Sequence, residues 1–142
     1  MEKYAILLGY LDKQLKLIHR LQGEVRIINL AIYENRYVFA LKVQQLYTAI
    51  EDLLKQIAKA FENHIQDLSS YHKELLTRLN TEIPQIRPAV ITHLTLLFLD
   101  KLRAFRHFVR HAYDCELDET ELTLIQKKLK TDFALFTKDI EA

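Results

Sequence analysis

Residues 39–61 read FALKVQQLYTAIEDLLKQIAKAF, and their pattern decides the fold class. The large apolar side chains in this stretch recur at intervals of three and four residues. These positions are Phe39, Val43, Leu46, Ile50, Leu53, Ile57 and Phe61. Because three to four residues make one turn of an α-helix, this spacing places them on one face. The stretch therefore predicts an amphipathic helix that ends near Asn63 and buries its apolar face.

The residues before this stretch predict another long helix, antiparallel to it. Their apolar side chains also keep to one helical face: Tyr4, Leu8, Leu11, Leu15, Ile18, Val25 and Ile32. We expect Asn35 to cap the boundary between the two helices. Gly23 either lies inside the first helix or splits it, and residue propensity alone leaves both possibilities open.

The middle of the chain predicts a short helix followed by an extended connection. Ser69 and Ser70 can cap a helix over residues 71–80, YHKELLTRLN. Residues 80–89, NTEIPQIRPA, contain both prolines of the chain. Proline removes a backbone donor and disfavours helix in the residue before it, so we expect an extended segment there.

Two further helices are predicted after this connection. One runs from about Pro88, which suits a first helical turn, to Tyr113. Its predicted buried face consists of Leu94, Phe98, Leu102, Phe105, Val109 and Ala112. A last helix opens at residues 118–121, DETE, which resemble a capping box with Asp118 in place of serine. Its predicted buried face consists of Leu122, Ile125, Leu129, Phe133, Phe136 and Ile140.

Together these patterns predict one all-α domain over residues 1–142, an up-and-down bundle of four long helices and one short helix. The formal net charge of +1 argues against a protein that coats nucleic acid, so any basic surface must be local. Cys115 is the single cysteine, which rules out an intramolecular disulfide and indicates a reducing compartment. The most apolar window, residues 90–99, is too short to cross a bilayer. We expect a cytoplasmic protein with no membrane partner.

Basic residues gather in residues 103–113, RAFRHFVRHAY. At helical spacing, Arg103, Arg106, Arg110 and Tyr113 form one stripe, and Arg103, His107 and His111 form a neighbouring one. We expect the two stripes to make one exposed basic face opposite the buried side chains. The ordinary interpretation is a solvated cationic face near a helix C-terminus. Within the helix, however, Asp100 is the only acidic residue placed to compensate these charges, so we expect compensation from outside it.

The mixture of side chains on this face suits phosphodiester chemistry. Arginine binds phosphate and stabilises charge that builds on phosphorus, while histidine transfers protons near neutral pH. Arg106 and His111 can fill these two roles. Glu51 can in principle neutralise such an arginine from across the bundle, but we expect it to face solvent and to pair with Lys55 at i+4.

The segment from Arg106 to Tyr113 resembles the Arg-x4-His-x-Tyr signature of the HepT toxins, ribonucleases of the HEPN superfamily. The resemblance implies a HEPN-type bundle and a metal-independent endoribonuclease that needs no cofactor and acts on cellular RNA. It implies Arg106 and His111 as the catalytic pair, in a composite site formed by a homodimer or an assembly of dimers. It also implies that a cognate minimal nucleotidyltransferase antitoxin attaches AMP to Tyr113.

His107 is a departure from the family pattern, which commonly has Asn or Asp at this position. His107 either shares the acid and base roles with His111 or positions RNA, and Arg103 and Arg110 are expected to contact RNA phosphates. No function is carried onto Asp114 or Asp118.

Two alternatives have weaker support in the sequence. His107 and His111 are spaced like two zinc ligands on one helix face, with Cys115 or Glu116 as a third ligand. The neighbouring arginines crowd that surface with positive charge, so no metal site is predicted. The second alternative is a catalytically silent helical module that partners a nucleotidyltransferase, which would not need His111.

Overall fold

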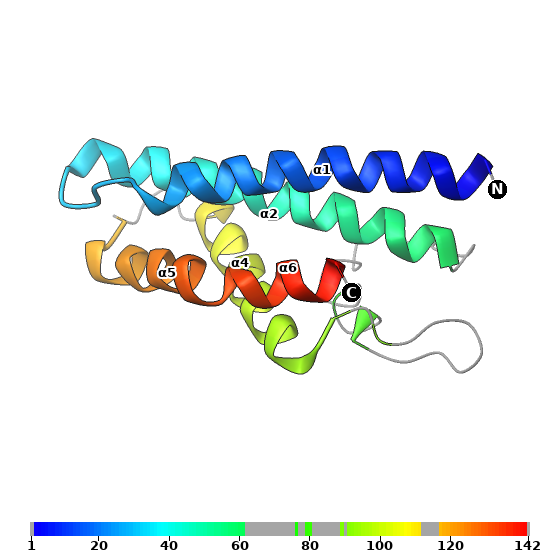
Figure 1. Ribbon diagram of the computed structural model, residues 1–142. Helices are drawn as coiled ribbons and strands as arrows, with labels where there is room; N and C mark the ends of the chain where they lie inside the picture. Colours follow the sequence, from blue (N-terminus) through cyan, green and yellow to red (C-terminus); the bar gives the residue numbers. More distant parts are fainter. Residues whose placement is uncertain are drawn as a thin grey trace.

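The computed structural model describes residues 2–61, 76, 79–80, 89, 91–111 and 117–141. Every regular element in these residues is an α-helix, which confirms the predicted all-α bundle (Figure 1). Nearly all of the predicted short helix over residues 71–80 lies outside the described residues, as do both prolines of the connection. The helices are α1 (Glu2–Arg26), α2 (Tyr33–Phe61), α4 (His93–His111), α5 (Glu119–Thr131) and α6 (Phe133–Glu141).

Helices α1 and α2 form a long antiparallel hairpin, as predicted (Figure 1). Gly23 lies inside α1 and does not split it. The expected cap at Asn35 is wrong, because Asn35 lies within the first turn of α2. The turn is instead organised by Asn29, whose Oδ1 accepts a hydrogen bond from the Ala31 N–H at 3.1 Å. Such side-chain bonds to the backbone favour turns over helix, and they move the boundary upstream of Asn35.

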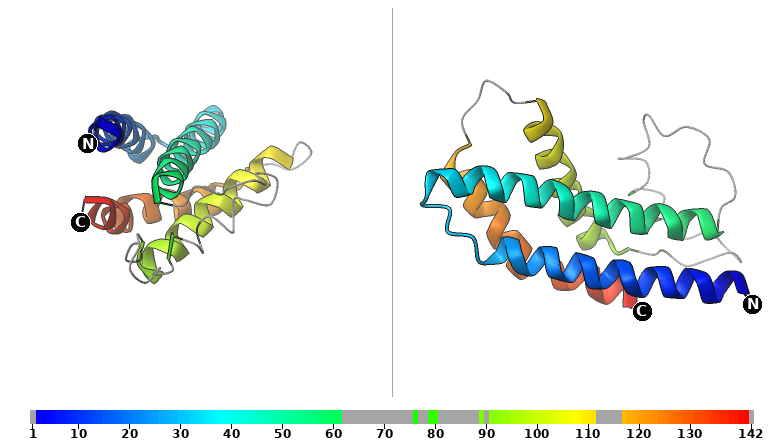
Figure 2. Two further views of the ribbon diagram at one scale, coloured as in Figure 1. Left: turned by 90° about the vertical axis from the view of Figure 1, so that its right-hand side faces the viewer. Right: turned by 90° about the horizontal axis from the view of Figure 1, so that it is seen from above.

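Helix α4 runs across the hairpin. The view along α1 and α2 shows α4 lengthwise, with its C-terminal end extending past α2 (Figure 2). α4 begins at His93, so the expected start at Pro88 is wrong. Thr92 precedes the first turn, and its hydroxyl accepts a bond from the Thr95 N–H at 3.4 Å. Leu94 therefore lies in the first turn of α4. The prediction that Leu94 is buried is wrong, because Leu94 is 61% exposed.

The start of α4 is fixed by Asp139 of α6. Asp139 Oδ2 accepts hydrogen bonds from the Thr92 N–H at 2.8 Å, the Thr92 hydroxyl at 3.1 Å and the fully buried Thr95 hydroxyl at 2.6 Å. Threonine residues at a helix start are normally satisfied by their own helix. Here a carboxylate 44 residues from Thr95 completes the cap and ties α6 to α4.

The last predicted helix is two helices, α5 and α6. Asp118 caps α5 as expected, since its side chain accepts a bond from the Thr120 N–H at 3.0 Å. The helix breaks at Asp132, whose N–H donates to the Lys128 carbonyl. The expectation of one continuous helix is therefore wrong. The break lets Phe133 of α6 meet the ring of His19 on α1 edge to face, with ring centroids 5.6 Å apart.

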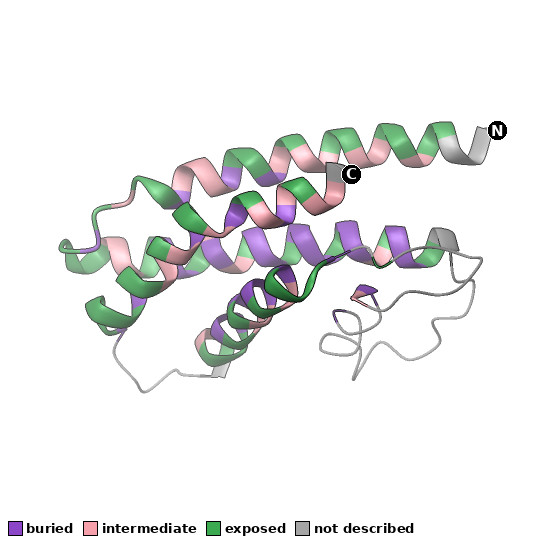
Figure 3. Cartoon of the chain, turned by 60° about the horizontal axis from the view of Figure 1, so that its bottom comes forward, coloured by how far each residue is buried: buried purple, intermediate pink, exposed green. Residues whose placement is uncertain are grey.

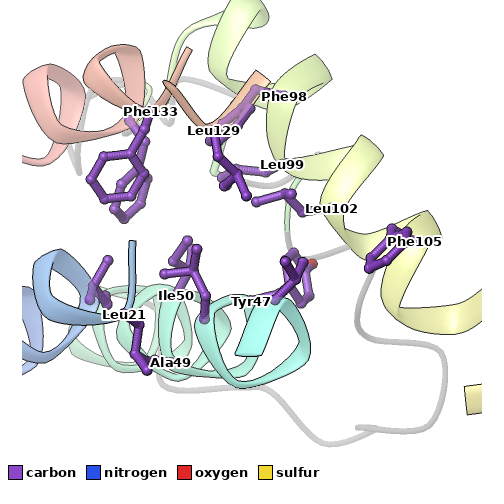
Figure 4. Packing of buried hydrophobic residues seen from close by; sticks show 14 of the residues in the cluster. Leu21, Tyr47, Ala49, Ile50, Phe98, Leu99, Leu102, Phe105, Leu129 and Phe133 are labelled. Atoms are coloured by element: carbon purple, nitrogen blue, oxygen red, sulfur yellow. The ribbon is translucent and has the colours of Figure 1, made fainter. Parts of the chain in front are cut away.

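The core lies on both sides of α2, which packs against α1 and crosses α4. Buried positions run along much of α2 (Figure 3). Leu99 and Leu102 of α4 point toward Tyr47 and Ile50 of α2 (Figure 4). No described helix is long and apolar enough to cross a membrane. Within the described part of the chain, three polar or charged residues are buried with this core: Glu51, Thr95 and Arg106.

Candidate active site at the crossing of α2 and α4

Arg106 is buried, so the expectation that it shares an exposed basic face is wrong. It is only 7% exposed. The cause is its position on the helix, because Arg106 follows the buried Leu102 by four residues and points to the same side. Arg106 therefore lies at the margin of the core rather than among the outward-facing cations of α4.

Three residues of α2 hold the Arg106 guanidinium. Its Nη2 donates to Glu51 Oε2 at 3.4 Å, and its Nη1 donates to the Thr48 hydroxyl at 3.3 Å. Its Cζ lies 4.7 Å from the centroid of the Tyr47 ring. An arginine over an aromatic ring gains a cation–π attraction that strengthens when water is excluded. The guanidinium is therefore held by adjacent turns of a single rigid helix.

Glu51 is buried, contrary to the expectation that it faces solvent. It is only 3% exposed, and its two oxygens contact different cations. Oε2 faces Arg106, and Oε1 lies 3.5 Å from Lys55 Nζ. The predicted pairing with Lys55 is confirmed. The compensating charge expected from outside α4 comes from Glu51 of α2.

Tyr47 is fully buried beneath the Arg106 guanidinium. Its hydroxyl has no hydrogen-bond partner among the described residues. Burial raises the pKa of Tyr47 well above the ordinary value of a tyrosine, and the charge of Glu51 raises it further, while Arg106 and Arg103 act in the opposite direction. The ring is therefore a neutral platform for the guanidinium at physiological pH.

The other predicted site residues on α4 lie farther from the core. Arg103 is partly buried, and its Nε donates to Asp100 Oδ1 at 2.8 Å. His107 and Arg110 are exposed. His111 ends α4, but its side chain and the whole of Tyr113 lie outside the described residues. The structure thus brings Arg106 together with Glu51, which the sequence did not place in the site.

Comparison with known protein families identifies the chain. Residues 38–142 match the family described as HepT-like protein. The chain belongs to this family. The match begins in α2 and includes both Glu51 and Arg106. A comparison with curated proteins and one with solved structures gave no significant match.

This HepT-like protein is therefore a HEPN-type, toxin-like protein, as the resemblance in its sequence implies. Among its described residues, no three His, Cys, Asp or Glu side chains gather closely enough to hold a metal ion. Cys115 and Glu116, the further zinc ligands considered above, lie outside those residues.

The role of Glu51 in this HepT-like protein had a signal in the sequence. Glu51 follows the buried Tyr47 by four residues and precedes the buried Leu54 by three, so it occupies a core position of α2. A charge at such a position needs a buried partner.

Proposed function

We propose that this HepT-like protein is a metal-independent endoribonuclease toxin that cleaves cellular RNA such as tRNA or mRNA. One observation carries the proposal. Arg106 is an arginine held in a fixed position, five residues before the histidine that ends the same helix. A guanidinium can stabilise the charge, and an imidazole can transfer the protons, in metal-free cleavage of a phosphodiester.

The proposed reaction uses the 2′-hydroxyl of the RNA as nucleophile. The 2′-oxygen bonds to phosphorus and the bond from phosphorus to the 5′-oxygen breaks. The 2′-hydroxyl loses one proton, and the leaving 5′-oxygen gains one. His111 transfers protons in this exchange, and Arg106 stabilises the negative charge that builds on the phosphoryl oxygens. A guanidinium fixed before substrate binds stabilises that charge with little reorganisation.

The site is proposed to be completed by a second subunit. On an ideal helix, five residues separate Arg106 and His111 by about 7.5 Å along the axis and roughly 140° around it. The two side chains therefore leave the helix in different directions. A homodimer, or an assembly of dimers, would bring the two motifs together across a two-fold axis.

The remaining cations of α4 are proposed to bind the RNA backbone. His107 and Arg110 are exposed, and Arg103 is partly buried. Contacts to phosphate release counterions from RNA, so binding through these residues should weaken as salt rises.

Inactivation is proposed to occur by AMP transfer to Tyr113 from ATP, catalysed by a cognate minimal nucleotidyltransferase antitoxin. The Tyr113 oxygen bonds to the α-phosphorus of ATP, pyrophosphate leaves, and the phenolic proton passes to solvent. The attached phosphate adds negative charge only seven residues after Arg106 in the sequence. It would therefore exclude an RNA phosphate from the site.

One observation favours a second candidate, a catalytically silent module that partners a nucleotidyltransferase. Arg106 is nearly covered in the single chain and already faces a carboxylate, which is also what a structural ion pair requires. Such a module would keep the pair and would not depend on His111.

The experiment that separates these candidates is cleavage of total cellular RNA in EDTA. The wild-type protein is compared with His111→Ala and with His93→Ala, a matched change at the other end of α4, where the side chain is exposed. Cleavage by the wild type and by His93→Ala, but not by His111→Ala, supports the ribonuclease. If no variant cleaves RNA and mass spectrometry finds Tyr113 unmodified, the silent module is correct.

A further inference from the structure

Glu51 is a charged residue at a position that an apolar residue would ordinarily fill. It lies on the core face of α2, next to the fully buried Tyr47 and Leu54. Replacing a buried ion pair by well-packed apolar residues is often neutral or stabilising. Stability alone therefore does not explain why Glu51 and Arg106 are charged.

The contacts around Arg106 restrain different motions of the guanidinium. The Tyr47 ring, 4.7 Å from Cζ, restrains the tilt of the guanidinium plane. Glu51 and Thr48 accept bonds from two different nitrogens, so they restrain rotation within that plane. Of these two acceptors, only Glu51 carries charge, so only its bond to the guanidinium joins two opposite charges.

Lys55 in turn holds the carboxylate of Glu51. Its Nζ lies 3.5 Å from Oε1, the oxygen that does not face Arg106. Lys55 is four residues after Glu51 on the same helix, and its side chain is 28% exposed. Lys55 therefore lies nearest the surface, while Glu51 and Arg106 are both buried. The carboxylate of Glu51 contacts a cation at each of its oxygens.

We propose that Glu51 is a positioning residue for RNA cleavage, whose buried carboxylate fixes the Arg106 guanidinium where the scissile phosphate binds. This inference rests on the proposed ribonuclease function. Glu51 itself contacts neither the RNA nor the reacting atoms. Displacing a catalytic group by about 1 Å can lower a rate about 100-fold, so the effect of losing Glu51 is measurable.

The test is steady-state cleavage of a fluorescent oligoribonucleotide by the full-length protein in EDTA. Glu51→Gln keeps the shape of the side chain and removes its charge. We expect kcat to fall about 10- to 100-fold, with KM changed less than about threefold, because the exposed cations still bind RNA. Glu51→Asp restores the charge on a shorter side chain, and we expect it to recover part of kcat. A 2′-O-methylated oligonucleotide, which lacks the nucleophile, should bind all variants with similar affinity.

A matched control separates positioning from stability. Glu24 of α1 pairs with Lys42 of α2 at 2.7 Å, so Glu24→Gln makes the same chemical change in another ion pair between helices. We expect Glu24→Gln to cleave RNA with unchanged kcat. Thermal unfolding of every variant is recorded, so that a rate is assigned only to folded protein. If Glu51→Gln does not fold, Glu51→Asp tests the inference, with a lowered kcat expected.

A double-mutant comparison asks whether Glu51 acts through Arg106. In an Arg106→Ala background, we expect Glu51→Gln to lower the residual rate no further. If folded Glu51→Gln cleaves RNA with the wild-type kcat, the inference is overturned and the proposed ribonuclease function stands. If Glu51→Gln does not fold, a wild-type kcat in folded Glu51→Asp has the same meaning. A wild-type protein that cleaves no RNA would overturn the proposed function, and the inference with it.

Discussion

Arg106 of α4 and Glu51 of α2 are 55 residues apart in the sequence and form a buried ion pair at the crossing of the two helices. The pair ties the C-terminal half of α4 to the central helix of the fold. The partly buried and exposed cations of α4 extend outward from this point. The proposed catalytic arginine therefore belongs to the core, and the proposed RNA contacts belong to the surface.

Removing one member of this pair should destabilise the protein more than removing both. Arg106→Met leaves the carboxylate of Glu51 buried without the guanidinium, and we expect a loss of about 3 kcal/mol in the free energy of unfolding. Combining Arg106→Met with Glu51→Leu should recover most of that loss, although the double variant should be inactive. Urea unfolding measures both values. A double variant as unstable as Arg106→Met would contradict this account of the pair.

Tyr47 predicts a loss of stability at high pH. Burial raises its pKa above the ordinary tyrosine value of 10.0 in the folded state, so the unfolded chain loses this proton first as pH rises. The contribution of Tyr47 to stability is fully present below about pH 10 and declines above it. Tyr47→Phe should remove this component and, because it deletes a buried hydroxyl without a partner among the described residues, should be at least as stable as the wild type near pH 7. Thermal unfolding of both proteins is measured between about pH 9 and pH 11, the range around the ordinary tyrosine pKa. If the stability of the two proteins declines equally over this range, the assignment to Tyr47 is wrong.

Asp139 should be the most important single cap in the structure. Asp139→Ala removes three accepted hydrogen bonds and leaves the buried Thr95 hydroxyl without this acceptor. We expect a loss of about 2 kcal/mol in the free energy of unfolding. Lys138→Ala, a change to the exposed neighbouring residue, serves as the control and should have little effect. Equal stability of the two variants in urea would contradict the role of Asp139.

Arg110 should contribute to RNA binding through charge alone. Its exposed position allows Arg110→Ala to be made without disturbing the core. We expect weaker binding of a 2′-O-methylated RNA and a salt dependence reduced by about 0.7 in the slope of log K against log salt. Lys130→Ala, which removes an exposed cation from α5, should leave that slope unchanged. An unchanged slope for Arg110→Ala would show that Arg110 does not contact an RNA phosphate.

Apolar spacing predicted much of the fold, because the buried stripe of α2 is continuous and long. It did not predict where α4 starts or where the last helix breaks. Those boundaries depend on hydrogen bonds with distant partners, above all Asp139, and on the turn at Asp132. Local spacing carries no information about such partners.

The site was predicted in part. The choice of Arg106 and His111 as catalytic groups stays a prediction. Treating Arg103, Arg106 and Arg110 as one exposed stripe overlooked that Arg106 also shares a side with the buried Leu102. Glu51 is likewise a charged residue on the buried apolar face of its helix, α2. Two opposite charges on the core faces of two helices are the pattern from which the buried pair follows.

The central claim is that RNA is cut by its own 2′-hydroxyl with histidine and arginine as the catalytic groups, and the ends of the product test it most directly. RNA is cleaved by wild-type protein in EDTA, and the new ends are examined by end labelling and mass spectrometry. The account predicts 2′,3′-cyclic phosphates and 5′-hydroxyl groups, formed much more slowly by Arg106→Ala and absent after treatment with His111→Ala. Products that carry 5′-phosphates, or cleavage that stops when EDTA is added, would contradict it.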